Sequence, residues 1–166
     1  LELLSGLKVD AIFLPSDLEM YPMGYSTYID EKKISKLLEG KSRPSFFKGV
    51  TTIVGKLFNI IQPTHSFFGD KDAQQLLIIQ KLITDLAYDI ELISCPIIRE
   101  KNGLAMSSRN RYLSESEKII ASEIFHALQN GKKTIIKGER DSQKIRKKII
   151  QILQKQNKIK IDYVSI

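Results

Sequence analysis

The sequence predicts an α/β fold in which a parallel sheet, followed along the chain by a small α+β unit, carries a ligand site. Short apolar runs at residues 11–14, 66–68 and 90–98 are typical of buried strands, and a helical pattern lies between the last two. Strands that alternate with helices indicate βα units and a parallel sheet. Because ligands bind such sheets at the carboxyl ends of the strands, we expect a site directly after residue 68.

The first part of the chain contains the elements of this sheet. Apolar side chains at helical spacing predict a helix over residues 74–86, with a face formed by Leu76, Ile79, Ile83 and Leu86. Pro96 has no backbone N–H, so it confines the strand at 90–98 to an edge or an end. Residues 1–4 are typical of the end of a helix. We assign residues 1–98 to this domain.

The second part of the chain contains a helix start signal. Ser114, followed three residues later by Glu117, has the pattern of a capping box. The helix that it predicts ends at Asn130-Gly131, because glycine is typical of a helix end. One apolar face of this helix is formed by Ile120, Ile124 and Leu128. We assign residues 99–166 to a hinge and a small α+β domain.

Two further elements complete this second unit. Isoleucines at helical spacing predict a helix over 142–157, and alternation of apolar and polar residues over 158–166 predicts a half-buried strand.

Residues 131–160 carry 11 Lys or Arg against two acidic residues, a balance that also suits a nucleic-acid partner. Because no aromatic side chains are interleaved with these cations, we favour the solvated face of a helix and expect no nucleic acid. A basic RNA-binding module is the alternative.

The composition is that of a globular protein. Of its 166 residues, 42% are hydrophobic and 27% are charged, and the net charge is +7. No apolar run approaches the roughly 20 residues that span a membrane, and the first residues do not resemble a signal peptide. Cys95 is the single cysteine and cannot form an internal disulfide, which fits a reducing cytoplasm. We expect a cytoplasmic protein with no membrane partner, in which Cys95 is a core residue.

Two polar segments have the chemistry of a nucleotide site. Residues 69–72 read Gly-Asp-Lys-Asp between an apolar run and a helical pattern. The glycine lets backbone amides approach a phosphate, and Lys71 supplies positive charge. Residues 107–109 read Ser-Ser-Arg, which offers two hydroxyls and a guanidinium to phosphate oxygens. Each segment alone is also typical of an ordinary surface loop, so the prediction of a nucleotide site depends on the occurrence of both.

These segments and three others resemble the pantothenate synthetase family, whose members join pantoate to β-alanine using ATP. Residues 38–44 read Leu-Glu-Gly-Lys-Ser-Arg-Pro, which matches the family pattern Leu-Glu-Gly-x-x-Arg-Pro, and residues 49–59 resemble the helix after it. Residues 67–75, 96–100 and 103–113 follow the family pattern closely. The resemblance extends over almost the whole chain.

The resemblance implies part of a Rossmann-like nucleotidyl-transferase sheet and an ATP-dependent ligase that forms pantothenate through pantoyl adenylate. It also implies a homodimer, and Mg²⁺ that accompanies ATP, held by phosphates and water without a protein metal site. Lys71 and Arg109 are the catalytic candidates, since cations must neutralise the phosphates, and Gln75 is the candidate for pantoate. The residues implied to contact ATP are Gly69, Asp70, Lys71, Asp72, Ile98, Met106, Ser107, Ser108 and Arg109.

The chain also departs from the family pattern. The family usually reads Arg-Pro-x-His-Phe where this chain has Phe46, and Asp70 and Ala73 replace a glutamate and a larger side chain. The family's His-x-Gly-His motif does not occur, since the only histidines are His65 and His126. We therefore expect an internal fragment of the family's length that is inactive or very slow alone. The alternatives are a non-catalytic truncated module and another adenylate-forming enzyme of the superfamily.

Overall fold

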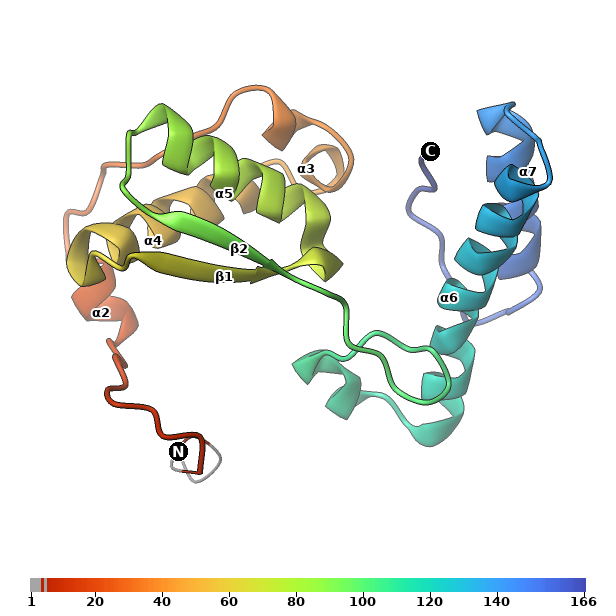
Figure 1. The fold of residues 1–166 in the computed structure, drawn as a ribbon, viewed down its shortest axis with the longest axis horizontal. Coiled ribbons are helices and arrows are strands. Elements are labelled where there is room, and N and C mark those ends of the chain that lie inside the picture. Colours follow the sequence, from red (N-terminus) through yellow and green to blue (C-terminus); the bar gives the residue numbers. More distant parts are fainter. Residues whose placement is uncertain (1–3, 5) are drawn as a thin grey trace.

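The computed structural model describes residue 4 and residues 6–166, which form two lobes joined by a linker over residues 96–114 (Figure 1). The first lobe holds the sheet, and the second holds a pair of helices. The α/β fold class is confirmed. The helix end expected at residues 1–4 falls largely on residues 1–3 and 5, which lie outside the described residues.

The sheet is a βαβ unit. Strands β1 (His65–Gly69) and β2 (Glu91–Cys95) are parallel and in register over their whole length, and helix α5 (Ala73–Asp85) connects them. Strand β2 ends directly before Pro96, whose missing N–H cannot continue the ladder. The strands expected at 66–68 and within 90–98, and the helix expected at 74–86, are therefore confirmed.

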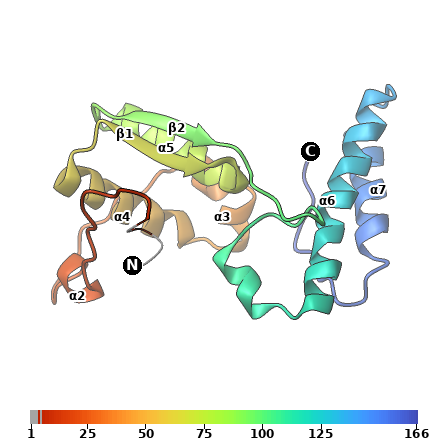
Figure 2. The same ribbon diagram turned by 60° about the horizontal axis from the view of Figure 1, so that its bottom comes forward.

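The core of the first lobe lies between one face of this sheet and two helices. Helix α4 (Phe46–Ile61) packs against α5, and Phe68 and Leu92 of the sheet face the buried side chains between them (Figure 2). The buried core residues are Phe58, Ile79, Leu82 and Ile83. On the other face of β1, Phe67 is 67% exposed. The sheet is thus covered by helices on one side only in the described part of the chain.

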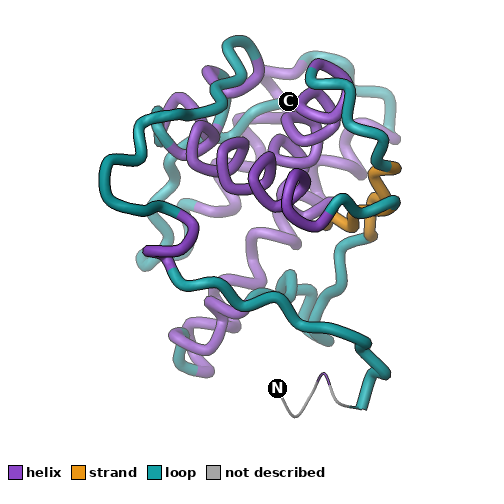
Figure 3. Tube along the Cα trace, turned by 90° about the vertical axis from the view of Figure 1, so that its left-hand side faces the viewer, coloured by secondary structure: helices purple, strands orange, loops and turns teal. Residues whose placement is uncertain are grey.

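The strand expected at residues 11–14 is wrong. This segment is extended but belongs to no ladder of the described residues, and its apolar side chains are exposed. Figure 3 shows loop along most of the chain before α4, interrupted by short elements. These are α2 (Asp17–Met20), the 3-10 helix η1 (Ile34–Lys36) and α3 (Glu39–Ser42). A strand needs a neighbour for its backbone groups, and the described sheet offers none to this segment.

The second lobe is built on α6 (Glu115–Ile136) and α7 (Ser142–Leu153), which pack against each other. The capping box of Ser114 and Glu117 is confirmed. The helix end expected at Asn130-Gly131 is wrong, because α6 continues to Ile136. Gly131 is buried where α7 comes close, and an added Cβ would lie 2.7 Å from Cδ1 of Ile149. Gly131 therefore allows α7 to pack closely on α6, and it does not end the helix.

The C-terminal segment, residues 158–166, is not the expected strand. It is extended, but no ladder partner for it exists among the described residues. Its apolar side chains instead pack on the core of α6 and α7, through Ile159, Ile161 and Val164. The second unit is therefore helical in the described chain, and the domain boundary at residue 98 stays a prediction.

Candidate functional site

A cleft of about 410 Å³ opens where the lobes meet. Its walls come from α3, the start of α4, the start of α5, the linker and the C-terminal segment. The candidate residues that line it are Lys71, Asp72, Gln75 and Arg109. The structure thus brings together two segments that the sequence separates by more than thirty residues.

The first half of the site lies at the carboxyl end of β1, as predicted. Gly69 has φ −83°, so its backbone does not require glycine, but an added Cβ would meet no atom within 4 Å. The backbone is therefore open to a ligand at this point. The next residues form the 3-10 helix η2 (Asp70–Asp72), which leads into α5. Open backbone before a helix start is a common phosphate-binding arrangement.

The charged side chains of η2 have different partners. Nζ of Lys71 lies 3.3 Å from Oδ1 of Asp72, and the Lys71 side chain is 39% exposed. The carboxylate of Asp70 instead accepts a hydrogen bond from the hydroxyl of Ser94, at the end of the neighbouring strand. Lys71 is thus free to move toward an anion, whereas Asp70 is held against β2 and does not line the cleft.

Two consecutive glutamines at the start of α5 have different positions. Gln75 is half-buried in the cleft wall, where its amide can donate and accept hydrogen bonds. The amide of Gln74 donates to the carbonyls of Ile34 (2.9 Å) and Leu37 (2.7 Å), and it accepts from the N–H of Glu39 (3.1 Å). Gln74 therefore attaches α3 to α5. Sequence analysis missed this role, because nothing in the local pattern separates Gln74 from Gln75.

The second half of the site is a loop that its own hydrogen bonds hold in shape. The N–H of Met106 donates to the carbonyl of Ile98 at 2.9 Å, which closes a turn around Gly103. The amide of Asn110 donates to Oε1 of Glu100 at 3.0 Å and to the carbonyl of Ala105 at 3.1 Å. These polar contacts hold the loop in shape, and the guanidinium of Arg99 also stacks 4.0 Å from the ring centre of Phe125 on α6.

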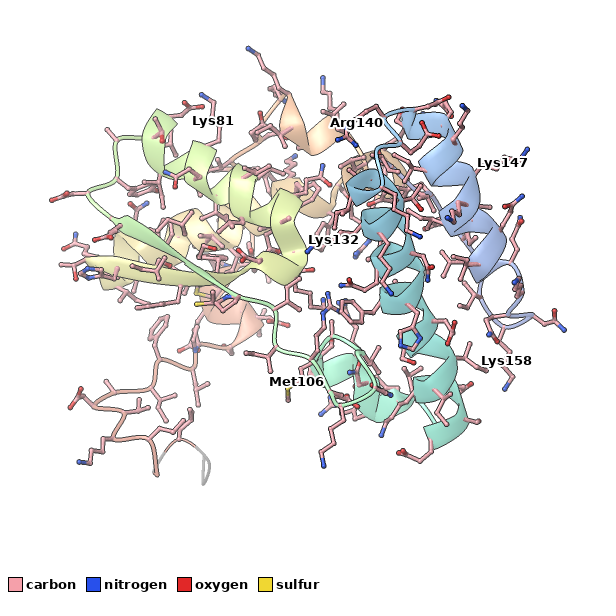
Figure 4. The ribbon with its side chains drawn as sticks, turned by 45° about the vertical axis from the view of Figure 1, so that its right-hand side comes forward. Lys81, Met106, Lys132, Arg140, Lys147 and Lys158 are labelled. Atoms are coloured by element: carbon pink, nitrogen blue, oxygen red, sulfur yellow. The ribbon has the colours of Figure 1, made fainter. Side chains whose placement is uncertain are left out.

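This loop places Arg109 in the cleft. The hydroxyl of Ser107 accepts a hydrogen bond from the N–H of Arg109 at 3.3 Å and so starts the 3-10 helix η3 (Ser108–Tyr112). Ile98 and Met106 are 62% and 56% exposed on the same loop, outside the cleft lining. Figure 4 labels Met106 on this linker between the lobes. The loop presents exposed apolar and hydroxyl groups next to the guanidinium.

The cleft residues outside the predicted set include Glu39, Arg43, Phe46 and Tyr163. Arg43 lies 3.4 Å from Oε1 of Glu39, and its guanidinium stacks 4.1 Å from the ring centre of Phe46. Tyr163 reaches the same cleft from the C-terminal segment. Burial, and then the negative charge of Glu39, raise the pKa of Tyr163. The 38–44 pattern already pointed to Glu39 and Arg43, but no local signal marks Tyr163.

The fold and this cleft place the chain in the class of α/β proteins whose ligand site lies at the carboxyl ends of parallel strands. The sequence model of the family described as pantoate-beta-alanine ligase matches residues 1–166. The chain belongs to this family.

Curated relatives are pantothenate synthetases. The protein from Thermotoga petrophila is 49% identical over 165 residues, which cover 99% of this chain and 59% of the relative. The protein from Acetivibrio thermocellus is 50% identical over 166 residues, again with 59% of its length covered. The chain thus spans about three fifths of the length of these relatives.

Solved structures agree with this assignment. Pantothenate synthetase from Thermus thermophilus matches with a TM-score of 0.92 and 36% identity, over 98% of this chain and 59% of that one. Pantoate-beta-alanine ligase from Francisella tularensis, complexed with beta-gamma ATP and β-alanine, matches with a TM-score of 0.75 and 35% identity. That match covers 91% of this chain and 56% of that one.

Proposed function

We propose that this chain forms part of an ATP-dependent ligase that condenses pantoate with β-alanine. One observation carries the proposal: Lys71, Gln75 and Arg109, from two segments that both follow the family pattern, line one cleft. Two cations suit the phosphates of ATP, and an amide suits the hydroxyl or carboxylate of pantoate. The family membership of the chain supports the same reaction.

The first chemical step joins two anions. An oxygen of the pantoate carboxylate attacks the α-phosphorus of ATP, the bond from that phosphorus to the bridging oxygen breaks, and diphosphate leaves. Attack by one anion on another is slow unless positive charge lies where negative charge develops. Lys71 and Arg109 supply that charge, and the open backbone at Gly69 adds amide donors. Gln75 orients pantoate for the attack.

The second step consumes the pantoyl adenylate. The neutral amine of β-alanine attacks the activated carbonyl carbon, the bond to the phosphate oxygen breaks, AMP leaves, and the nitrogen loses a proton to water as the amide forms. Mg²⁺ accompanies ATP and is held by phosphate oxygens and water. In the described chain no group of three His, Cys, Asp or Glu side chains could hold a metal ion by itself.

The ATP-binding set extends beyond the cleft residues. The exposed loop places Ile98 beside Met106, which suits contact with an adenine ring, while the serines offer hydroxyls to phosphates. The proposed contacts of ATP are Gly69, Asp70, Lys71, Asp72, Ile98, Met106, Ser107, Ser108 and Arg109. The Asp70 carboxylate accepts a hydrogen bond from Ser94, so we expect Asp70 to contact ATP through its backbone.

We also propose that the protein acts as a cytoplasmic homodimer. No helix of the described residues is long and apolar enough to cross a membrane. The exposed face of β1 around Phe67 offers apolar surface to another polypeptide. Sedimentation velocity over a range of protein concentrations tests the dimer, and a single monomeric species at all concentrations would contradict it.

The activity is tested by AMP formation from Mg-ATP, with and without pantoate and β-alanine. We expect the 166-residue chain to bind Mg-ATP but to turn over very slowly, because its sequence has no His-x-Gly-His motif. We expect turnover when the chain is joined to the remaining part of the Thermotoga petrophila relative. AMP release that requires a different carboxylate would favour another adenylate-forming reaction, and no release by the joined protein would overturn the proposal.

A further inference from the structure

The linker folds into a short hairpin over residues 98–106, next to α6 (Figures 1 and 2). Arg99 forms an antiparallel bridge with Ala105, and the N–H of Met106 donates to the carbonyl of Ile98 at 2.9 Å. A two-stranded hairpin alone is at best marginally stable in water. This hairpin therefore needs an attachment to a packed element.

Two side chains attach the hairpin to α6. The guanidinium of Arg99 stacks on the ring of Phe125, 4.0 Å from the ring centre, and it donates a hydrogen bond to the carbonyl of Gly103 at 3.0 Å. The Arg99 and Phe125 side chains are both half-buried. A partly desolvated guanidinium is attracted to an aromatic face more strongly than an exposed one. Arg99 thus joins the turn of the hairpin to the surface of α6.

The backbone of Gly103 shows how closely this turn approaches Phe125. Gly103 has φ +90°, a conformation that residues with a side chain rarely adopt. An added Cβ at this position would also lie 2.4 Å from Cδ1 of Phe125. The backbone conformation and the neighbouring ring therefore both require glycine here, and the ring lies directly against the turn.

The hairpin in turn holds the residues that follow it. The side-chain amide of Asn110 donates to Oε1 of Glu100 at 3.0 Å and to the carbonyl of Ala105 at 3.1 Å, so it is bonded to both strands of the hairpin. Asn110 directly follows Arg109, which lines the cleft. A continuous series of contacts therefore extends from α6 through the hairpin to Arg109.

We propose that Phe125 and Arg99 are positioning residues, whose stack fixes the hairpin on α6 and so sets the place of Arg109 in the cleft. This inference rests on the proposed function, in which Arg109 binds ATP. Neither Phe125 nor Arg99 lines the cleft, so they act on the ligand through Asn110 and Arg109. Loss of the stack opens the hairpin while α6 and α7 stay packed, because other side chains form the core between these helices.

The test measures hydrogen exchange of backbone amides in the 166-residue chain by NMR. Met106, which Figure 4 labels on the linker, is the main reporter, because its N–H closes the hairpin. Phe125→Leu keeps an apolar side chain but removes the aromatic face. We expect this variant to lower the protection of the Met106 amide about fivefold, the effect of losing one cation–π contact. The amides of α7 should keep their wild-type protection, because the opening is local.

Two further variants test whether the aromatic face is the cause. Phe125→Tyr keeps the ring and is expected to exchange like the wild type. Arg99→Lys keeps the charge but not the planar guanidinium, so it is expected to resemble Phe125→Leu. The matched control is Tyr112→Leu, which removes a ring 4.9 Å from the guanidinium of Arg111, on a residue that is 72% exposed. This control should leave the protection of the Met106 amide unchanged.

The affinity for Mg-ATP, measured by titration calorimetry, tests the step from the hairpin to Arg109. Phe125→Leu should raise the dissociation constant about threefold. Combined with Asn110→Ala, it should weaken binding by less than the product of the two single effects, because both substitutions act on one series of contacts.

Unchanged protection of the Met106 amide in Phe125→Leu would overturn the proposal. So would an equal loss of protection in α7, because it would show that Phe125 only stabilises the second lobe as a whole. A loosened hairpin with unchanged Mg-ATP affinity would overturn the link to Arg109. The exchange measurement needs no ligand, so a wild-type chain that binds no Mg-ATP would count against the proposed function, while the exchange data still decide whether the stack holds the hairpin.

Discussion

The two halves of the cleft are held in place by different forces. Lys71 follows a strand and precedes a helix whose Ile79 is fully buried, so the packed core of the first lobe fixes its backbone. Arg109 lies on a loop that polar contacts of Ser107 and Asn110 hold in shape. A packed core opens only when the whole lobe unfolds, whereas such hydrogen bonds can break in a local opening. Changes to the core behind the first half should therefore alter stability, whereas changes to the polar contacts of the loop should alter the site alone.

The largest effect is expected from the core behind the first half. Ile79→Ala removes a side chain with no exposed surface and leaves a cavity, so the free energy of unfolding should fall by about 2–5 kcal/mol. Urea unfolding measures this loss. The control is Leu77→Ala on the same helix, which is 58% exposed and should change stability by about 0.5 kcal/mol or less. Similar losses for both variants would show that packing does not fix this half.

Within the cleft, Lys71→Ala should weaken Mg-ATP binding about tenfold or more without changing stability. A charged donor to phosphate is lost, and the side chain is too exposed to matter for packing. Titration calorimetry measures the affinity. Lys81→Ala is the matched control, because Lys81 also pairs with a neighbouring aspartate on the first lobe but lies away from the cleft. An equal loss in both variants would indicate a general charge effect.

A smaller effect on binding is expected from the loop. Asn110→Ala removes the amide that joins Glu100 to Ala105, so Arg109 should lose its fixed position and Mg-ATP affinity should fall about three- to fivefold. The free energy of unfolding should hardly change. Asn130→Ala, which removes one amide bonded to a carbonyl within α6, serves as the control. If Asn110→Ala also lowered the free energy of unfolding of the protein, the proposed difference between the two halves of the cleft would be wrong.

The smallest effect concerns the helix that follows the loop. Ser114→Ala removes the hydroxyl of the capping box, which should cost about 1 kcal/mol of stability at neutral pH. Hydrogen bonds from the backbone and the side chain of Ser114 lower the pKa of Glu117 below its usual 4.5. A lowered pKa stabilises the fold above pH 4.5, and this contribution is lost as the pH falls through the folded pKa.

The loss caused by Ser114→Ala should therefore shrink in acid. Unfolding curves of wild type and variant at several pH values between neutral and strongly acidic measure the difference. A difference that stays constant through the titration of Glu117 would show that the ionised carboxylate takes no part in the cap.

The sequence predicted the parts of the molecule that local patterns determine. The βαβ unit and the capping box were predictable, because apolar spacing and cap residues act within a few positions of the chain. The strands expected at 11–14 and 158–166 are wrong, because alternation describes a half-buried segment whether or not a neighbour pairs with it. The role of Gly131 depends on the approach of α7, which no local pattern contains.

The candidate site shows the same limit. Motifs point to Lys71, Gln75 and Arg109, and the structure shows that these residues line one cleft, while their roles stay a prediction. Tyr163 was not predictable, because it joins Glu39 in the wall of the cleft from more than a hundred residues away. When a residue joins the site from the other lobe, no pattern in the sequence next to it predicts that position.

Gln74 has a consequence for how the cleft can change shape. Its one amide group serves three backbone groups of the segment from Ile34 to Glu39, so this segment and the start of α5 form a single rigid block. The backbone of Glu39 is then expected to move together with the start of α5. Changes in the width of the cleft are therefore expected to come from the linker and the C-terminal segment, which form other parts of its wall.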